Sequence, residues 1–169
     1  MKQYNRVCAR INLDAIAYNM EQMKNRIGQE GRLIAVIKTD AYGHGAVPLA
    51  EMFEETPYIW GYAVACMGEA RTLRAHGIKK PILILGCVFP DEYEEMVEKE
   101  IRAAVYTEEM AKGMAEAAVR SGKTAFLHIK IDTVQIPSDL GVIPPSGFKC
   151  LLDQMPCNPF NHCSINRRK

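Results

Sequence analysis

Short apolar runs alternate with amphipathic segments through about residue 131, and this alternation restricts the fold more than any other feature of the chain. We expect strands at 33–38, 60–65, 82–86, 102–106 and 126–131, with helices near 46–55, 68–76, 91–99 and 108–121 between them. A further helix over 14–27 precedes the first strand, with Asp14 as its N-cap and Gly28 as its stop. A repeated strand–helix order predicts an α/β fold with a parallel sheet.

The expected strands are apolar on both faces, and the segment 82–85 shows this most plainly. Such strands are typical of a parallel sheet that is covered on each side, either in a barrel or in an open doubly wound sheet. No G-x-G-x-x-G motif follows the first strand, and a lysine ends that strand, so we favour the barrel. A complete barrel has about eight strands. We therefore predict an incomplete TIM-type (β/α) barrel with about five parallel strands.

Lys38 is the first candidate functional residue, because it ends the apolar run 33–37 and begins the glycine-containing turn 39–45. Active sites of barrels lie at the carboxyl ends of the strands. A lysine amine that is partly shielded from water can condense there with an aldehyde to form a Schiff base. A lone lysine at a strand end is more often a solvated charge, so this interpretation depends on the residues around it.

The segment AVIKTDAYGHG, residues 35–45, resembles the cofactor-lysine motif of alanine racemases, the fold-type III pyridoxal phosphate enzymes. Shorter matches to that family occur in INLDAI, GYAVA, GEA at residues 68–70 and HIKIDT, and the resemblance covers about residues 6–133. It implies the N-terminal barrel domain of a homodimeric isomerase that binds pyridoxal 5'-phosphate. The substrate would be alanine, whose D-form is a peptidoglycan precursor.

By this resemblance, Lys38 would hold pyridoxal 5'-phosphate as a Schiff base and would act as the base on one face of the substrate. Tyr42 would contact the phosphate of the cofactor. Lys130, in the segment HIKIDT, is a candidate for the lysine that the family often carbamylates and uses to orient an arginine seven residues later.

The residues of the turn also have simpler interpretations. Tyr42 alone could pack on the helix expected at 46–55, and Gly43 and Gly45 could merely supply positive φ angles. His44 could cap that helix or form a hydrogen bond within the turn, and we assign it no catalytic role.

The sequence changes character at Thr133, and the segment 134–169 holds five of the 9 prolines and no glutamate. The family pattern D-T-G-M-x-R is absent there: Val134 follows Thr133, and Pro137 stands where the pattern has its arginine. We therefore expect a partial barrel over 1–133 and an irregular tail over 134–169, as a reading-frame change would produce. Racemase activity is then expected to be impaired, and the alternatives are a non-catalytic barrel fragment or a pyridoxal phosphate carrier or homeostasis protein.

The composition argues against several other classes of function. With 21 basic and 20 acidic residues, the chain has no net field that would recruit nucleic acid or an anionic membrane. No signal peptide and no membrane span is expected, which predicts a soluble, cytoplasmic protein. The 6 cysteines form no CxxC pair, so we expect reduced thiols. Cys150, Cys157, Cys163 and His162 do not match a zinc pattern, so we expect no metal.

Overall fold

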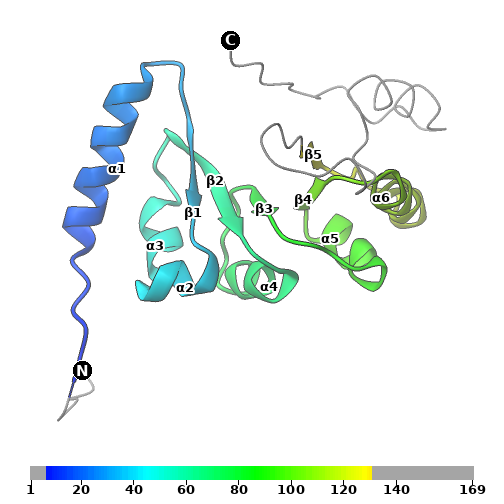
Figure 1. Ribbon diagram of the computed structural model, residues 1–169, viewed down its shortest axis with the longest axis horizontal. Helices are drawn as coiled ribbons and strands as arrows, with labels where there is room; N and C mark the ends of the chain where they lie inside the picture. Colours follow the sequence, from blue (N-terminus) through cyan, green and yellow to red (C-terminus); the bar gives the residue numbers. More distant parts are fainter. Residues whose placement is uncertain (1–6, 131–169) are drawn as a thin grey trace, which may run out of the picture.

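A computed structural model describes residues 7–130 of the chain. Its five strands lie in one sheet, and Figure 1 shows them in sequence order between α1 at one end of the molecule and α6 at the other. The strands are β1 (Leu33–Val36), β2 (Ile59–Val64), β3 (Ile82–Ile84), β4 (Ile101–Val105) and β5 (Leu127–Ile129). The helices are α1 (Leu13–Ile27), α2 (Lys38–Gly43), α3 (Ala46–Phe53), α4 (Met67–Ala75), the 3-10 helix η1 (Pro90–Glu92), α5 (Tyr93–Glu98) and α6 (Glu108–Ser121).

The order of the strands distinguishes between the two architectures that the sequence left open. Each strand pairs in parallel with the next one along the chain, and the order β1-β2-β3-β4-β5 never reverses. A doubly wound sheet reverses its strand order at a switch point, whereas a barrel adds its strands in sequence. The described residues therefore have the topology of a barrel.

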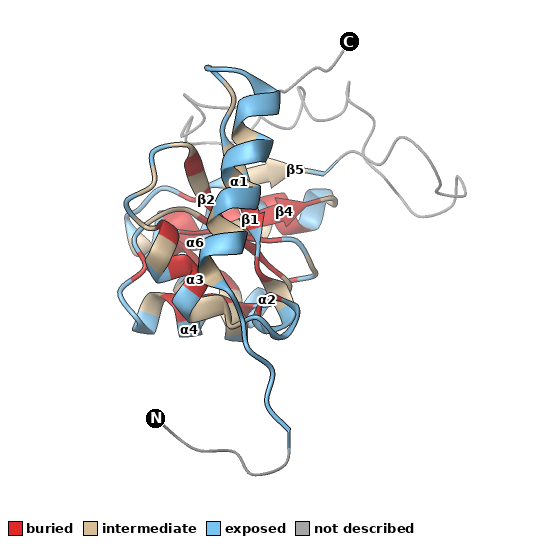
Figure 2. Ribbon diagram, turned by 90° about the vertical axis from the view of Figure 1, so that its left-hand side faces the viewer, coloured by how far each residue is buried: buried red, intermediate tan, exposed pale blue. Residues whose placement is uncertain are grey.

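The hydrophobic core lies between the sheet and the helices α3 to α6. Ile82 and Ile84 of β3 are fully buried in this core, whereas Leu83 between them joins Ala63 and Ala104 in a small separate cluster. This alternation is expected, because successive side chains of a strand point to opposite faces of the sheet. Figure 2 shows the buried residues concentrated in the strands and in the helix surfaces that face them.

The other face of the sheet is only partly covered. Three apolar side chains of β1 and β3 or just after them remain exposed: Ile34 by 38%, Val36 by 45% and Leu85 by 39%. The sequence predicted strands covered on both sides. Within residues 7–130, the helices of the main core cover one side.

Helix α1 contributes no buried residue and lies at one end of the molecule, as Figure 1 shows. Its partly buried residues Leu13, Ile16 and Met20 pack against the main core. The prediction of its N-cap was wrong: Asn12 caps the helix, because its side-chain oxygen accepts a hydrogen bond of 3.0 Å from the amide of Ala15. The predicted stop at Gly28 is correct.

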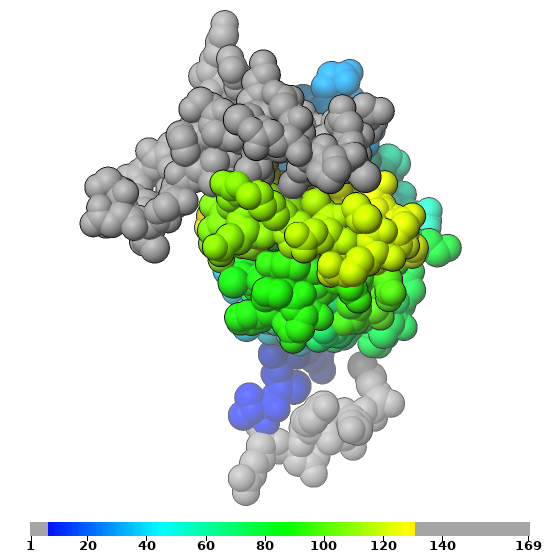
Figure 3. All heavy atoms as spheres, turned by 90° about the vertical axis from the view of Figure 1, so that its right-hand side faces the viewer, coloured from blue at the N-terminus to red at the C-terminus, as the bar shows by residue number. Residues whose placement is uncertain are grey.

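Most other elements lie close to their predicted positions, but β1 ends at Val36 instead of residue 38, and α2 was not predicted. Helix α6 begins after Thr107, whose hydroxyl accepts a hydrogen bond from the amide of Met110, and it ends at Gly122 in the left-handed conformation. Figure 3 shows the end of the molecule opposite α1, where green and yellow residues of the second half of the described chain form the surface. The helix predicted over 91–99 is divided into η1 and α5, because Pro90 starts a 3-10 turn.

The predicted tail over 134–169, with its three cysteines and His162, lies outside the described residues. Between residues 7 and 130, no helix combines the length and the apolar character that crossing a membrane requires.

Candidate functional site

The candidate site lies where the strands end, because the carboxyl ends of parallel strands meet at one edge of the sheet. Lys38 follows β1 by two residues and is half-buried, while Tyr42 is 61% exposed. The amine nitrogen of Lys38 lies 5.9 Å from the centre of the Tyr42 ring. The structure thus brings these two predicted site residues together at the edge where barrels bind their ligands.

The turn that carries both residues has an unusual backbone. Thr39, Asp40, Ala41 and Tyr42 all have positive φ angles, between 51° and 56°, so α2 is a left-handed helical turn. For residues other than glycine this conformation costs roughly 1–2 kcal/mol each. The sequence predicted an ordinary glycine-containing turn here. The residue types at 39–42 do not predict four consecutive residues in the left-handed conformation.

Two carboxylates hold this turn in place. The Oε1 atom of Glu69 accepts a hydrogen bond of 2.7 Å from the amide of Thr39, and its Oε2 atom accepts one of 2.7 Å from the amide of Ala65. At the other end of the turn, the Oδ1 atom of Asp40 accepts a hydrogen bond of 2.7 Å from the amide of Ala46, the first residue of α3. Hydrogen bonds to charged groups contribute about 1.5–3 kcal/mol each, enough to offset a strained backbone.

The remaining residues of the turn have structural roles. The Nδ1 atom of His44 lies 2.8 Å from the carbonyl oxygen of Ala41 and donates a hydrogen bond to it. Of the two interpretations of His44, the hydrogen bond within the turn is therefore the correct one. Gly43 and Gly45 have φ angles of 86° and 91°, as their simpler interpretation predicted. Tyr42 is too exposed to serve as a packed aromatic residue of α3.

Neighbouring strand ends complete the edge. The amide of Leu85 donates to the carbonyl oxygen of Val64, and a Cβ atom on Gly86 would lie only 2.3 Å from the carbonyl oxygen of Ala65. Only glycine fits at residue 86 without moving the backbone. A hydrogen bond with Cys87, followed by burial, raises the pKa of Tyr106, the residue that follows β4.

Lys130 lies one residue beyond β5, and its amide donates a hydrogen bond of 2.9 Å to the carbonyl oxygen of Val105. The sequence placed it in a strand, where a buried lysine needs a partner or a modification. Its side chain is exposed in the structure, so burial supplies no reason for carbamylation. The modification therefore stays a prediction, and Pro137 lies outside the described residues.

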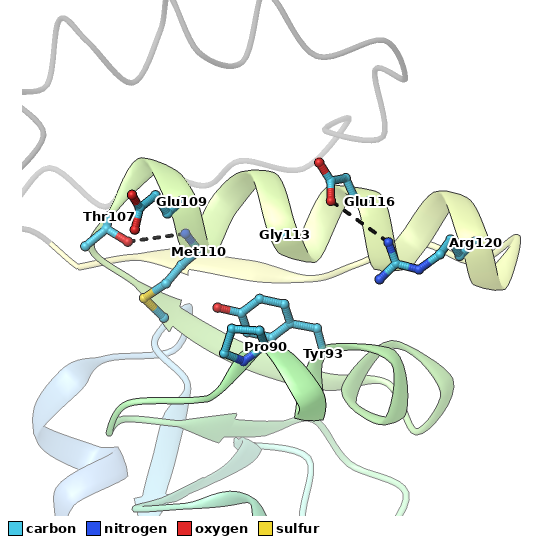
Figure 4. Close-up of a pocket in the computed structure, with 8 residues that line it drawn as sticks. All are labelled: Pro90, Tyr93, Thr107, Glu109, Met110, Gly113, Glu116 and Arg120. Atoms are coloured by element: carbon cyan, nitrogen blue, oxygen red, sulfur yellow. Dashed lines mark hydrogen bonds and ion pairs between the residues drawn. The ribbon is translucent and has the colours of Figure 1, made fainter.

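A separate hollow of about 260 Å³ lies between η1, α5 and α6 (Figure 4). Tyr93 points into it from α5, and Gly113 of α6 leaves room for that ring, because a Cβ there would lie 2.6 Å from Tyr93 Cε2. Arg120, at its rim, is already paired with Glu94 and Glu116. The hollow contains neither Lys38 nor Tyr42, and we assign it no function.

With the geometry established, comparison with known proteins identifies the family. The sequence profile described as alanine racemase, N-terminal domain, matches residues 11–147. The chain belongs to this family. The motifs quoted above end at Thr133, whereas the family match continues to residue 147.

Relatives and solved structures agree with this assignment. Alanine racemase from Clostridium tetani is 42% identical over 132 residues, which are 78% of this chain and 34% of that protein. The structure of alanine racemase from Clostridium difficile 630 in complex with cycloserine has a TM-score of 0.74 at 33% identity, covering 86% of this chain and 37% of that chain. Histidine racemase from Leuconostoc mesenteroides has a TM-score of 0.69 at 26% identity, covering 83% of this chain and 37% of that chain.

This chain spans about a third of the length of the curated relatives it matches. The likeness to the solved racemases confirms the predicted fold class, an α/β fold with five parallel strands that matches the N-terminal barrel of alanine racemase.

The sequence alone did not single out Glu69 and Asp40, the two carboxylates that hold the turn. Both lie inside segments that matched the family, GEA and TDAYG, but their contacts depend on the fold. A glutamate in the first turn of a helix that follows a strand was the one available signal, because such a carboxylate lies beside free backbone amides.

Proposed function

We propose that this chain is the pyridoxal 5'-phosphate-binding domain of an alanine racemase-like isomerase, with Lys38 as the residue that holds the cofactor. The observation that carries the proposal is the pairing of the Lys38 amine with the Tyr42 ring, 5.9 Å away, at the carboxyl edge of a parallel sheet. Family membership supports it, and a half-buried amine beside an exposed phenol offers one group to an aldehyde and another to a phosphate.

The residues present fit that cofactor chemically. An amine can condense with its aldehyde, and a phenol hydroxyl can donate a hydrogen bond to a phosphate oxygen. When bound, pyridoxal phosphate supplies an electron sink that stabilises the negative charge left after an α-proton is removed from an amino acid. The Nζ atom of Lys38 would hold or return that proton on one face of the substrate, while Tyr42 would keep the phosphate in place.

Alanine is the proposed substrate, because the related racemases are named for it. The related fold of a histidine racemase indicates that this architecture also serves a different side chain, so a panel of amino acids belongs in every assay. A homodimer and a cytoplasmic location belong to the same proposal.

We further propose that racemisation by this chain is impaired. Pro137 stands seven residues after Lys130, where the family pattern has the arginine that contacts the substrate carboxylate. Without a clamp on that carboxylate, the substrate is poorly oriented for proton transfer. When loaded with pyridoxal phosphate, the chain should therefore interconvert the enantiomers of alanine only slowly, whereas capture of the cofactor by Lys38, which needs no such clamp, should be unaffected. Rapid racemisation that disappears in Lys38→Ala would contradict the impairment.

The cofactor assignment is tested by mixing the full chain with pyridoxal phosphate, reducing with borohydride and mapping the modified lysine by mass spectrometry. We expect the label on Lys38, together with the visible absorbance of lysine-bound cofactor, and neither in Lys38→Ala. Lys79→Ala is the matched control, because Lys79 is an exposed lysine just before β3, at the opposite edge of the sheet. Labelling spread over surface lysines, or unchanged in Lys38→Ala, would overturn the proposal.

A further inference from the structure

Glu69 links the ends of two adjacent strands. One of its carboxylate oxygens accepts a hydrogen bond from the amide of Thr39, the residue after Lys38. The other accepts a hydrogen bond from the amide of Ala65, the residue after β2. Both distances are 2.7 Å, which is short for a nitrogen–oxygen hydrogen bond and typical of a charged acceptor. The residue itself is half-buried in the first turn of α4.

The amide that Glu69 binds belongs to the first left-handed residue of α2. Thr39 has a φ of 55° and a ψ of 48°, a conformation that β-branched residues rarely adopt. A strained backbone persists only when its surroundings hold it in place. Glu69 supplies that restraint beside Lys38, as Asp40 does at the far end of the turn through the amide of Ala46.

We propose that Glu69 is a positioning residue for Lys38: by binding the amides of Thr39 and Ala65 with separate oxygens, it fixes where the left-handed turn leaves β1 and so where the lysine amine points. This inference rests on the proposed function, because the position of Lys38 matters only if its amine reacts. Glu69 itself touches neither substrate nor cofactor in this role.

A purely structural role has a different consequence. A carboxylate in the first turn of α4 also stabilises that helix through its dipole, and its loss would then lower stability without changing the reactivity of Lys38 in the folded protein. The two roles are separated by measuring capture of pyridoxal phosphate per folded molecule.

Glu54 provides a matched control at the opposite end of the sheet. It is also half-buried, and its Oε1 atom accepts hydrogen bonds of 2.7 Å and 2.9 Å from the amides of Lys79 and Lys80. Because one oxygen receives both bonds, Glu54→Gln can keep them through its amide oxygen. Glu69→Gln must lose one of its two bonds, since its NH₂ group cannot accept.

The first measurement needs no cofactor. Amide hydrogen exchange followed by NMR on the full chain should show at least about tenfold faster exchange at Thr39 or Ala65 in Glu69→Gln, and at both in Glu69→Ala. Glu54→Gln should leave these two amides unchanged. Unchanged exchange at both positions in Glu69→Ala would overturn the proposal.

The second measurement is the rate at which Lys38 captures pyridoxal phosphate, normalised to the folded fraction from circular dichroism. We expect it to fall about tenfold or more in Glu69→Gln and to stay within about twofold of the native rate in Glu54→Gln and Glu54→Ala. Equal capture by native protein and Glu69→Gln would overturn the positioning role while leaving the proposed function intact.

The two measurements also separate the two proposals. If native protein captures no cofactor, the proposed function fails, and the exchange of the Thr39 and Ala65 amides alone decides whether Glu69 fixes the turn. If Glu69→Ala does not fold, Glu69→Asp replaces it: its shorter side chain can reach only one amide, so the other should exchange faster. Native exchange at both amides in Glu69→Asp would count against the inference.

Discussion

The guanidinium of Arg102 lies 4.8 Å from the centre of the Trp60 ring. The ring of Phe126, the residue before β5, lies 4.4 Å from the same guanidinium, so it and Trp60 of β2 enclose one cation. Its Nε atom is buried without a hydrogen-bond partner, which offsets part of the attraction between cation and rings.

Substitutions at Arg102 should therefore distinguish the contribution of its packing to stability from the contribution of its charge. We expect Arg102→Met to change the free energy of unfolding by less than about 1 kcal/mol, because methionine keeps the apolar contact and removes the unpartnered nitrogen. Arg102→Ala should cost about 2 kcal/mol through lost packing. Urea unfolding followed by the fluorescence of Trp60, the chain's 1 tryptophan, measures both values. Equal losses in the two variants would show that the charge is what matters.

His128 should make stability depend on pH. Burial, and then the nearby Arg102, lowers the pKa of His128 below its ordinary value of 6.5. The unfolded chain therefore binds a proton before the folded one does. Stability from this residue is complete above about pH 6.5 and is lost as the pH falls through the folded pKa, with a slope of at most about 1.4 kcal/mol per pH unit.

The measurement is the free energy of unfolding at several pH values between about 5 and 7.5, a range that includes the ordinary histidine pKa. His128→Gln should show a flatter dependence than the native chain. His76→Gln is the control, because His76 is exposed at the end of α4. A native-like slope in His128→Gln would assign the effect to other groups.

Tyr42→Phe tests the proposed phosphate contact. With 61% of the residue exposed, loss of its hydroxyl should leave the melting temperature unchanged. Affinity for pyridoxal phosphate should fall about tenfold, as expected for one hydrogen bond to a charged group. An absorbance titration of both proteins gives the ratio, and equal affinities would remove Tyr42 from the cofactor site.

Gly86→Ala should destabilise the candidate site directly. Its new Cβ would lie 2.3 Å from the backbone oxygen of Ala65, so we expect a loss of about 2 kcal/mol, the cost of overpacking. Gly68→Ala is the matched control in α4: the nearest atom to its new Cβ is the Cys66 sulfur at 3.9 Å, and alanine favours a helix. Thermal unfolding of both variants should move in opposite directions. Similar shifts of the melting temperature in the two variants would mean that the ends of β2 and β3 can move apart to accommodate the new Cβ atom.

Much of the fold could be predicted from periodicity. The apolar spacing located α6 and the order of all five strands, because burial of one helix face or of a strand imposes a pattern on the sequence itself. Strand ends were less predictable: β3 covers Ile82–Ile84 and is shorter than the expected 82–86.

The candidate site was only partly predictable. Lys38 and Tyr42 were identified as candidates because a family motif contains them, and the structure places the Lys38 amine near the Tyr42 ring. The contacts of Glu69 with Thr39 and Ala65 were not foreseen, because they join segments far apart in sequence through backbone atoms, which carry no residue-specific signal. The left-handed backbone of α2 was hidden for a similar reason, as Thr39 and Tyr42 do not favour it.

The unreversed strand order has a consequence for how this polypeptide acquires its structure. Since every strand among residues 7–130 pairs with its immediate predecessor or successor, only one crossover, of one helix or of two consecutive short helices, separates the members of each pair. Parallel pairs form more slowly than hairpins, but one crossover is the shortest connection that such a pair permits, which keeps the entropic cost of closing each loop small. The sheet can thus assemble progressively, one unit after another, as the chain leaves the ribosome.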